Sequence, residues 1–185
     1  MKKIGLTIGK FAPLHKGHQL VIETALREMD ELYVVIYHTH LINIPLQRRA
    51  SWIQTLYPTV KIIFANEPPN QYGLDDKAVK VQMDYLSSLI GSLKVTHFYS
   101  SEKYGRCAAQ ALQAEDRQVD PARTVVPICA SAIREDPSRY KRYMEPLVYE
   151  DVVRYCREMD KHQDSVALPV GETPVRLMLQ GGSRR

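Results

Sequence analysis

The chain has 185 residues, 44% of them apolar and 25% charged, a length that suits one domain with a full core, or one domain with an appendage. The net charge is +4, and half of it lies in residues 165–185, where three arginines stand against one glutamate. So slight a positive charge argues against a dedicated nucleic-acid-binding protein.

The sequence also argues against membrane insertion and secretion. Its longest apolar stretches, such as Tyr33–Tyr37, are strand-sized and far shorter than the roughly 20 residues of a membrane span. Gly5, Gly9 and Lys10 interrupt the first apolar segment, which does not resemble a signal-peptide core. The three cysteines, at positions 107, 129 and 156, form no CxxC motif and no even framework. We therefore expect a cytoplasmic protein with reduced thiols and no membrane partner.

Apolar, β-branched runs alternate with segments of helical periodicity along the chain. The predicted strands span Lys3–Ile8, Leu32–Tyr37, Val60–Phe64, Val95–Tyr99 and Thr124–Ile128, and the predicted helices span about His18–Met29, Leu46–Leu56, Asp76–Ile90, Tyr104–Ala114 and parts of Ser131–Asp160. This order predicts the α/β class, as a doubly wound, Rossmann-like parallel sheet of five strands with helices on both faces. Ligands of such sheets bind at the carboxyl ends of the strands.

Residues 1–160 are expected to form the one domain, and residues 161–185, which contain several Pro and Gly, a flexible C-terminal tail. Between the third predicted strand and the next helix lies the Pro- and Asn-rich stretch 66–73. Connections of this length are often functional, so this stretch is a candidate substrate loop.

The first motif, GKFAPLHKGH at residues 9–18, follows the first predicted strand. Gly9 lets the backbone approach a ligand at the strand tip, and Pro13 stiffens the loop. His15 and His18 lie three residues apart at the start of a helix, so both point toward the pole where free N–H groups and the helix dipole attract anions. The motif therefore indicates a polyphosphate site, at the strand where a doubly wound sheet reverses direction.

The second motif, PICASAIR at residues 127–134, precedes another predicted helix. Ser131 is placed to cap that helix, and Arg134 in the first turn can reach back with a planar, permanently charged guanidinium that suits phosphate. A second helix start is thus expected to face anions.

The two motifs together resemble the signature of the nucleotidyltransferase α/β-phosphodiesterase superfamily, with HxGH on a GxFxPxHxGH loop and a late (I/V)S(S/A/G)TxIR helix start. Within it, the chain is most similar to NadR-type nicotinamide-nucleotide adenylyltransferases over about residues 3–145. Pro45-Leu46 with Arg49 and Trp52 match the family's PLxxRxxW helix, residues 100–105 match its SSExYG segment, and residues 119–123 match the stretch before its last motif.

The resemblance implies that residues 1–160 form an adenylyltransferase domain, which joins the AMP moiety of ATP to nicotinamide mononucleotide (NMN) by direct in-line transfer and yields NAD and pyrophosphate. No covalent enzyme intermediate is implied. The implied catalytic residues are His15, His18, Arg134 and Lys10; Gly9, Phe11, Ser100, Ser101, Tyr104, Cys129 and Ser131 complete the ATP site; and Arg49, Trp52, Asn70 and Tyr72 contact the acceptor. Mg²⁺ would be bound through the ATP phosphates, with few or no protein ligands. Relatives commonly assemble, so a homo-oligomer is expected.

The chain departs from the family pattern in three places. Cys129 replaces the usual serine with a weaker hydrogen-bonding group, and Ser131 replaces the usual threonine but keeps the hydroxyl. The loop that often carries stacking tryptophans in the family offers only Tyr72, since Trp52 is the sole tryptophan. No GxxxxGK(S/T) motif occurs, so the kinase domain that often follows in this family is not expected.

Several alternatives remain open. The acceptor is nicotinate mononucleotide or phosphopantetheine in other members of the superfamily, and a nucleotide-binding sensor would keep the pocket without turnover. His15 and His18 together with His38 and His40 would suit zinc, although no cysteine or carboxylate stands at ligand spacing. Trp52 suits a core position equally well, and Arg49 suits a solvated helix face. The basic run at residues 139–143 is better explained as a solvated face than as a nucleic-acid patch.

Overall fold

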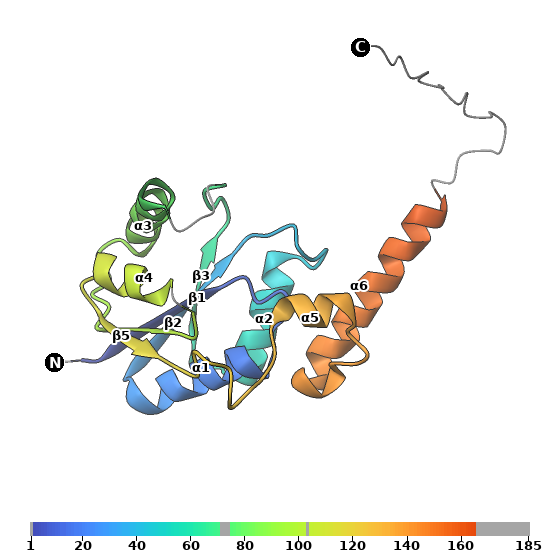
Figure 1. Cartoon of the computed structure of the whole chain (residues 1–185), viewed down its shortest axis with the longest axis horizontal. Coiled ribbons are helices and arrows are strands. Elements are labelled where there is room, and N and C mark those ends of the chain that lie inside the picture. Colours follow the sequence, from blue (N-terminus) through green and yellow to red (C-terminus); the bar gives the residue numbers. More distant parts are fainter. Residues whose placement is uncertain (1, 71–74, 103, 166–185) are drawn as a thin grey trace, which may run out of the picture.

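The computed structural model describes residues 2–70, 75–102 and 104–165, and for residues 156–165 it describes the helical backbone alone. Five parallel strands form one sheet in the order β3-β2-β1-β4-β5 (Figure 1). The strands are β1 (Ile4–Gly9), β2 (Glu31–Tyr37), β3 (Lys61–Ala65), β4 (His97–Ser100) and β5 (Glu115–Gln118); the helices are α1 (Lys16–Glu28), α2 (Leu46–Leu56), α3 (Asp76–Ile90), α4 (Gly105–Ala111), α5 (Ala130–Glu135) and α6 (Pro146–Ser165), with a 3-10 turn η1 (Lys141–Tyr143). The predicted doubly wound, Rossmann-like sheet is confirmed.

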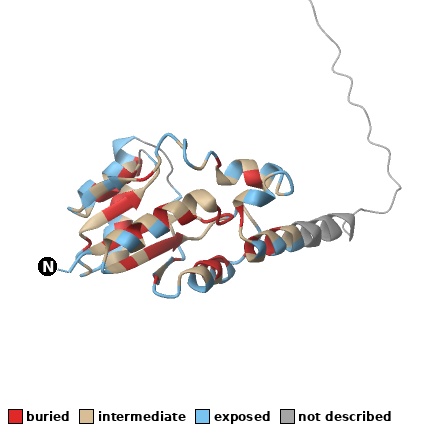
Figure 2. Cartoon of the chain, turned by 90° about the horizontal axis from the view of Figure 1, so that it is seen from below, coloured by how far each residue is buried: buried red, intermediate tan, exposed pale blue. Residues whose placement is uncertain are grey.

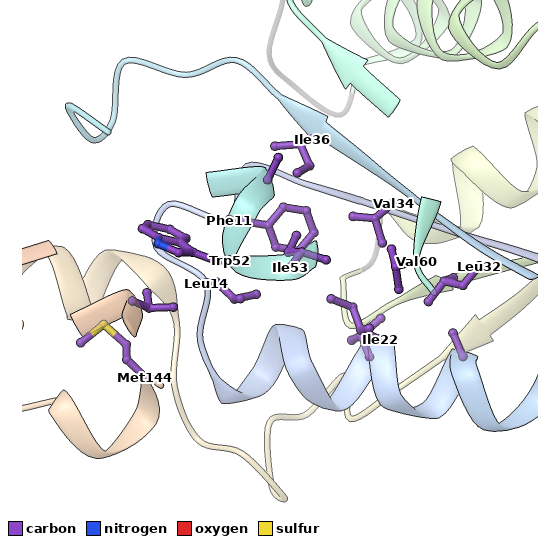
Figure 3. Close-up of a cluster of buried hydrophobic side chains, with 14 of the residues drawn as sticks. Phe11, Leu14, Ile22, Leu32, Val34, Ile36, Trp52, Ile53, Val60 and Met144 are labelled. Carbon is purple, nitrogen blue, oxygen red and sulfur yellow. The ribbon is translucent and has the colours of Figure 1, made fainter. Parts of the chain in front are cut away.

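Alternate residues of the central strands supply the cores on the two faces of the sheet. Val34 and Ile36 of β2 pack with the apolar sides of α1 and α2, where Figure 3 shows them beside Ile22 and Ile53. Val35, between them, belongs to the opposite cluster with residues of α3 and α4. Because β2 is buried on both faces, its sequence reads as a continuous apolar run, as is usual for parallel sheets.

The chain reverses direction across the sheet at β1. From β1 it winds outward to β2 and β3, and then crosses back to add β4 and β5 on the other side. The loop after β1 therefore lies at the switch point, where the crossover connections leave a crevice at the carboxyl edge. The predicted position of the first motif relative to the sheet is confirmed.

The fifth strand was predicted in the wrong place. Residues Thr124–Ile128 are irregular, and the strand beside β4 is Glu115–Gln118 instead. An edge strand needs little apolar character, and in β5 the exposed Glu115 and Arg117 alternate with half-buried residues. The apolar stretch at 124–128 escapes pairing because the Asp120 carboxylate accepts hydrogen bonds from three of its backbone N–H groups.

The predicted C-terminal helical region separates into α5, η1 and α6, and α6 projects from the body of the domain (Figure 1). The first part of α6 carries the buried residues Val148, Asp151 and Val152, and Figure 2 shows buried positions there. This helix continues to Ser165, beyond the predicted domain boundary at residue 160, and residues 166–185 of the predicted tail lie outside the described residues. No helix in the described part of the chain combines the length and the apolar character needed to cross a membrane.

Hydrogen bonds to the Asp151 side chain hold α6 against α2. Its side chain is only 4% exposed, and it accepts hydrogen bonds from Trp52 Nε1 at 2.7 Å, from Arg154 at 2.6 Å and from Arg48 Nε. Burial raises the pKa of Asp151, but the hydrogen bonds from Arg48 and Trp52 and the two arginine charges outweigh it, so the pKa lies below its ordinary value. The carboxylate therefore stabilises the folded chain in its charged form.

We expect Asp151→Asn to lower the free energy of unfolding by roughly 2 to 4 kcal/mol near neutral pH, because the buried Trp52 N–H and two arginines lose their charged partner. Urea denaturation measures this difference. Since the folded-state pKa is depressed, the stabilisation is complete above the ordinary Asp pKa of about 4 and fades as the pH falls through the lower folded-state value. The difference between variant and parent should therefore shrink below about pH 4.

Asp84→Asn is the matched control, because Asp84 pairs with Lys80 on the surface and the two side chains are 65% and 75% exposed. Its effect should stay below about 0.5 kcal/mol. Equal effects of the two substitutions, or a difference that grows in acid, would contradict the role given to Asp151.

Candidate active site

A pocket of about 590 Å³ opens at the carboxyl edge of the sheet, beside the loop that follows β1. It brings together most of the residues that the two motifs singled out. The predicted site residues that line it are Gly9, Lys10, Phe11, His15, His18, Ser100, Ser101, Tyr104, Cys129, Ser131 and Arg134. Segments more than 100 residues apart in the sequence thus meet at the switch point of the sheet.

His15 and His18 form a stacked pair at the N-terminus of α1. Their ring centroids are 3.8 Å apart with 25° between the planes, which confirms the prediction that both point the same way. His15 caps the helix, since its Nδ1 accepts a hydrogen bond from the Gly17 N–H at 3.1 Å. Nδ1 therefore carries no proton in the neutral ring, and the ring proton lies on Nε2. His15 can donate this N–H to an anion while it holds the helix cap.

Burial keeps both imidazoles neutral. Together with the smaller effect of the Arg123 charge, it lowers the pKa of His15 to about 4. Burial, then the His15 charge and then that of Arg123 lower the pKa of His18 well below its ordinary value. Burial and the Arg134 charge also lower the pKa of Lys10. A polyphosphate entering here would raise all three pKa values, because an opposite charge favours the protonated form.

Two glycines leave space that the site needs. A Cβ atom on Gly17 would lie 3.0 Å from Cε1 and 3.1 Å from Nδ1 of His15, so a side chain there would displace the capping ring. A Cβ atom on Gly105 would lie 1.8 Å from Ser100 Oγ, which is closer than any two such atoms can approach. Close packing therefore disfavours a side chain at the glycine of HxGH, and a side chain at the glycine of the SSExYG segment would force Ser100 to move.

The second motif lies beside the first, with two corrections. Helix α5 starts at Ala130 with Cys129 as its N-cap residue, so Ser131 does not cap it. Arg134 lies in the last turn of this six-residue helix rather than the first, and donates to the carbonyl oxygen of Ala12 at 2.7 Å. This bond ties α5 to the loop after β1 and places the guanidinium on the pocket.

The Cys129 thiol lies 3.0 Å from the Ser131 hydroxyl. Its pKa is lowered by this hydrogen bond first, then by the backbone N–H of Ala132, with a smaller contribution from the Arg123 charge. A thiol on the pocket with a lowered pKa is more reactive than an ordinary cysteine.

The opposite end of the pocket is aromatic and uncharged. Tyr37, at the end of β2, contacts Tyr85 of α3 with ring centroids 6.2 Å apart, and Tyr104 donates a hydrogen bond to Gln82 Oε1 at 2.9 Å. Burial raises the pKa of Tyr104 to about 12, and burial also raises that of Tyr37. These phenols therefore stay neutral. Pro68 and Pro69, from the predicted substrate loop, line the same pocket.

Arg49 and Trp52, predicted to contact the acceptor, do not line the pocket. The Arg49 guanidinium is fully buried and donates to the backbone carbonyls of Ile44 at 3.2 Å, of Tyr37 at 3.0 Å and of Lys10. Burial lowers its pKa to about 10. Trp52 is also fully buried, with its N–H bonded to Asp151. Because these hydrogen bonds engage their polar groups, Arg49 and Trp52 stabilise the segments around the pocket and do not line it.

The remaining candidates lie elsewhere. Asn70 is exposed and does not line the pocket, and Tyr72 lies outside the described residues. His38 and His40 contact each other beyond the end of β2, with centroids 4.7 Å apart, but they do not line the pocket either. Within the described ranges no group of three or more His, Cys, Asp or Glu is placed to hold a metal ion, which leaves the zinc alternative without a ligand set.

Sequence reasoning missed several pocket residues. Arg123 and Asp120 line it from the loop before α5, and Tyr37, Gln82 and Tyr85 form its aromatic end. The two loop residues stand in the segment that resembled the family, and this was the signal that could have identified them. The tyrosines carry no such signal, because their side chains converge only through the tertiary fold.

Curated relatives of this chain are named after NAD biosynthesis. The trifunctional NAD biosynthesis/regulator protein NadR of Salmonella typhimurium is 28% identical over 176 residues, which cover 83% of this chain and 41% of that protein. A probable nicotinate-nucleotide adenylyltransferase of Nitratiruptor is 24% identical over 177 residues, which cover 84% of this chain and 99% of that protein. The chain thus spans about two fifths of the NadR length. No protein-family model matches it.

Solved structures share the fold. A NadR protein in complex with NAD and AMP-PNP superposes with a TM-score of 0.57 at 22% identity, over 80% of this chain and 46% of that one. A bifunctional NMN adenylyltransferase/ADP ribose pyrophosphatase of Francisella tularensis, complexed with AMP and a manganese ion, superposes with a TM-score of 0.54 at 17% identity, over 89% and 56%. The homologues and structural neighbours of this chain are therefore NadR proteins and nicotinamide- and nicotinate-nucleotide adenylyltransferases of the nucleotidyltransferase superfamily.

Proposed function

We propose that this chain is an adenylyltransferase that joins the AMP moiety of ATP to NMN, forming NAD and releasing pyrophosphate. The observation that carries the proposal is one pocket with two chemically different ends, one with the cations Lys10, Arg123 and Arg134 beside the stacked histidines of α1, and one that is aromatic at Tyr37 and Tyr85. A nucleoside polyphosphate suits the first end and a ring-bearing acceptor the second. The names of the relatives support NAD biosynthesis and adenylyl transfer to a pyridine mononucleotide, and the Nitratiruptor protein is named for the acid form, nicotinate mononucleotide.

The proposed reaction needs alignment and charge stabilisation more than it needs a nucleophilic side chain. An oxygen of the NMN phosphate attacks the α-phosphorus of ATP, and the bond from that phosphorus to the pyrophosphate oxygen breaks on the opposite side. The electron pair of that bond leaves with pyrophosphate. His15, His18 and Arg134 line the pocket where they would donate N–H groups to the phosphate oxygens as negative charge shifts to the leaving group.

The ATP phosphates would also bring the divalent cation that a pyrophosphate-releasing reaction commonly uses. The site suits this arrangement, because its phosphate end offers N–H donors and cationic groups, and the described residues form no group of three or more His, Cys, Asp or Glu placed to hold a metal ion. We propose Mg²⁺, held by phosphate oxygens and water, where it would neutralise the developing charge. The bifunctional Francisella protein is complexed with AMP and a manganese ion, which agrees with the use of a divalent cation.

The aromatic end favours an amide over an acid on the pyridine ring. Tyr37, Leu41, Pro68, Pro69, Gln82, Tyr85 and Tyr104 line the pocket, and none of these side chains carries a positive charge. The carboxylate of nicotinate mononucleotide would lose water there without gaining a cationic partner, whereas the neutral carboxamide of NMN loses less. We therefore propose NMN as the preferred acceptor.

Pyrophosphate release with ATP and Mg²⁺ tests the reaction and the acceptor together. We expect turnover with NMN, a kcat/KM at least about tenfold lower with nicotinate mononucleotide because its charge is desolvated, and none with phosphopantetheine. Preference for the acid form would overturn the acceptor assignment. ATP binding without turnover on any acceptor would replace the enzyme with a nucleotide-binding sensor.

Substitutions at the phosphate end test the assigned roles. His18→Ala and Arg134→Ala should each lower kcat/KM by about 10² to 10⁴, because each removes a donor to the transferred or leaving phosphate. His40→Ala is the matched control, since it removes an imidazole that does not line the pocket. Near-normal rates for His18→Ala and Arg134→Ala, with the control also normal, would refute the placement of the phosphates.

Cys129 should report on nucleotide binding. We expect iodoacetamide to modify it faster than Cys107, because its pKa is lowered and it lines the pocket, whereas Cys107 does not. Saturating ATP should slow the modification of Cys129 and leave that of Cys107 unchanged. Mass spectrometry of the alkylated peptides measures both rates. If ATP does not change the rate at Cys129, this residue does not border the ATP site.

A further inference from the structure

Arg123 is a cation on the pocket with no role in either motif. It lines the cavity from the loop between β5 and α5, and its positive charge contributes to the lowered pKa values of His15, His18 and Cys129. Its field therefore reaches the residues of the phosphate end. Its guanidinium pairs with Glu102 Oε1 at 2.9 Å.

Hydrogen bonds within the loop hold the backbone at Arg123. Arg123 and Asp120 both adopt positive φ angles, 53° and 50°, and the Arg123 N–H donates to the Asp120 carbonyl at 2.9 Å. The Asp120 carboxylate accepts hydrogen bonds from the N–H groups of Thr124, Val125 and Val126 at 2.8, 3.1 and 2.9 Å. Left-handed backbone at two non-glycine residues persists only where surrounding contacts hold it, so the loop presents Arg123 from a defined position.

The backbone of Glu102, the other partner of this ion pair, is also held by hydrogen bonds. Its carbonyl oxygen accepts hydrogen bonds from Ser100 Oγ at 3.2 Å and from the Gly105 N–H at 2.9 Å, while its side chain is 66% exposed. Among the described residues that line the pocket, the only other carboxylate is that of Asp120, which is committed to backbone N–H groups. Glu102 therefore supplies the acidic group that meets Arg123.

An ion pair this exposed contributes little free energy, about 1 kcal/mol at most by analogy with surface pairs, so a stronger anion can replace the carboxylate. A triphosphate carries more negative charge than one carboxylate and presents several oxygens to a guanidinium fork. Both partners can separate by side-chain rotation alone, because their backbones are held.

We propose that Arg123 is a further polyphosphate-binding residue and that Glu102 is its internal counterion, which releases the guanidinium when the phosphates of the nucleotide arrive. This inference rests on the proposed function and extends it, since it concerns how the same pocket takes its nucleotide. The carboxylate occupies the guanidinium until binding, and it therefore lowers the affinity for ATP.

Isothermal titration of ATP, pyrophosphate and adenosine tests this exchange without requiring turnover. Arg123→Gln should raise the Kd of ATP and pyrophosphate about tenfold to a hundredfold, because charged hydrogen bonds are lost, and leave that of adenosine unchanged. Glu102→Gln should lower the Kd of ATP about two- to fivefold, since the competing charge is gone. This gain should shrink in the double variant, where no guanidinium remains to be released.

Arg117→Gln is the matched control, because Arg117 forms a comparable pair with Glu28 but does not line the pocket. Its Kd for ATP should equal that of the parent. Weaker ATP binding by Glu102→Gln would overturn the proposal, because Glu102 would then orient Arg123 rather than compete for it. Unchanged binding by Arg123→Gln, in a parent that binds ATP, would refute this inference alone. A parent that binds no ATP would refute the proposed function as well.

Discussion

The buried guanidinium of Arg49 joins the three segments on which the pocket depends. It donates to carbonyl oxygens of the loop after β1, of the end of β2 and of the segment that leads into α2. No described carboxylate shares this position, so carbonyl dipoles compensate the charge, and burial lowers the pKa to about 10. Buried polar groups are costly to leave unpaired, and the three carbonyls and the guanidinium therefore stabilise one arrangement of the segments.

The loop held by Arg49 is contacted again from the other side. Arg134 of α5 donates to the Ala12 carbonyl, so the second motif is fastened to the first before any ligand arrives. His15 caps α1 through Nδ1, which leaves its other ring nitrogen for an anion. His15 and Arg134 thus have two functions, since one atom of each side chain supports the backbone while the side chain also lines the pocket. Such preorganisation is what charge-stabilised transfer reactions require.

The two ends of the pocket lie toward opposite faces of the sheet, since α1 packs on one face and α3 and α4 pack on the other. The aromatic end draws on β2, the β3–α3 connection and α3, with Tyr104 closing it from the start of α4. The cationic end draws on α1, α5 and the loop that Asp120 braces. Because β1 lies at the switch point, a ligand that spans both ends crosses directly over the GKFAPLHKGH loop. Glu102, the exposed carboxylate among the described residues that line this pocket, pairs with Arg123.

The sequence by itself determined the parallel sheet, the bounds of α2 and α3, and the meeting of the two motifs, because apolar periodicity and local motif chemistry are written in consecutive residues. It did not determine β5, whose polar residues at the edge of the sheet give no apolar signal, while the apolar run at 124–128 is a loop held by Asp120. Nor did it separate Arg49, which supports the pocket from behind, from Arg123, which lines it. Whether an arginine lines the pocket or is buried beside it depends on the packing of distant segments, and only the tertiary structure decides it.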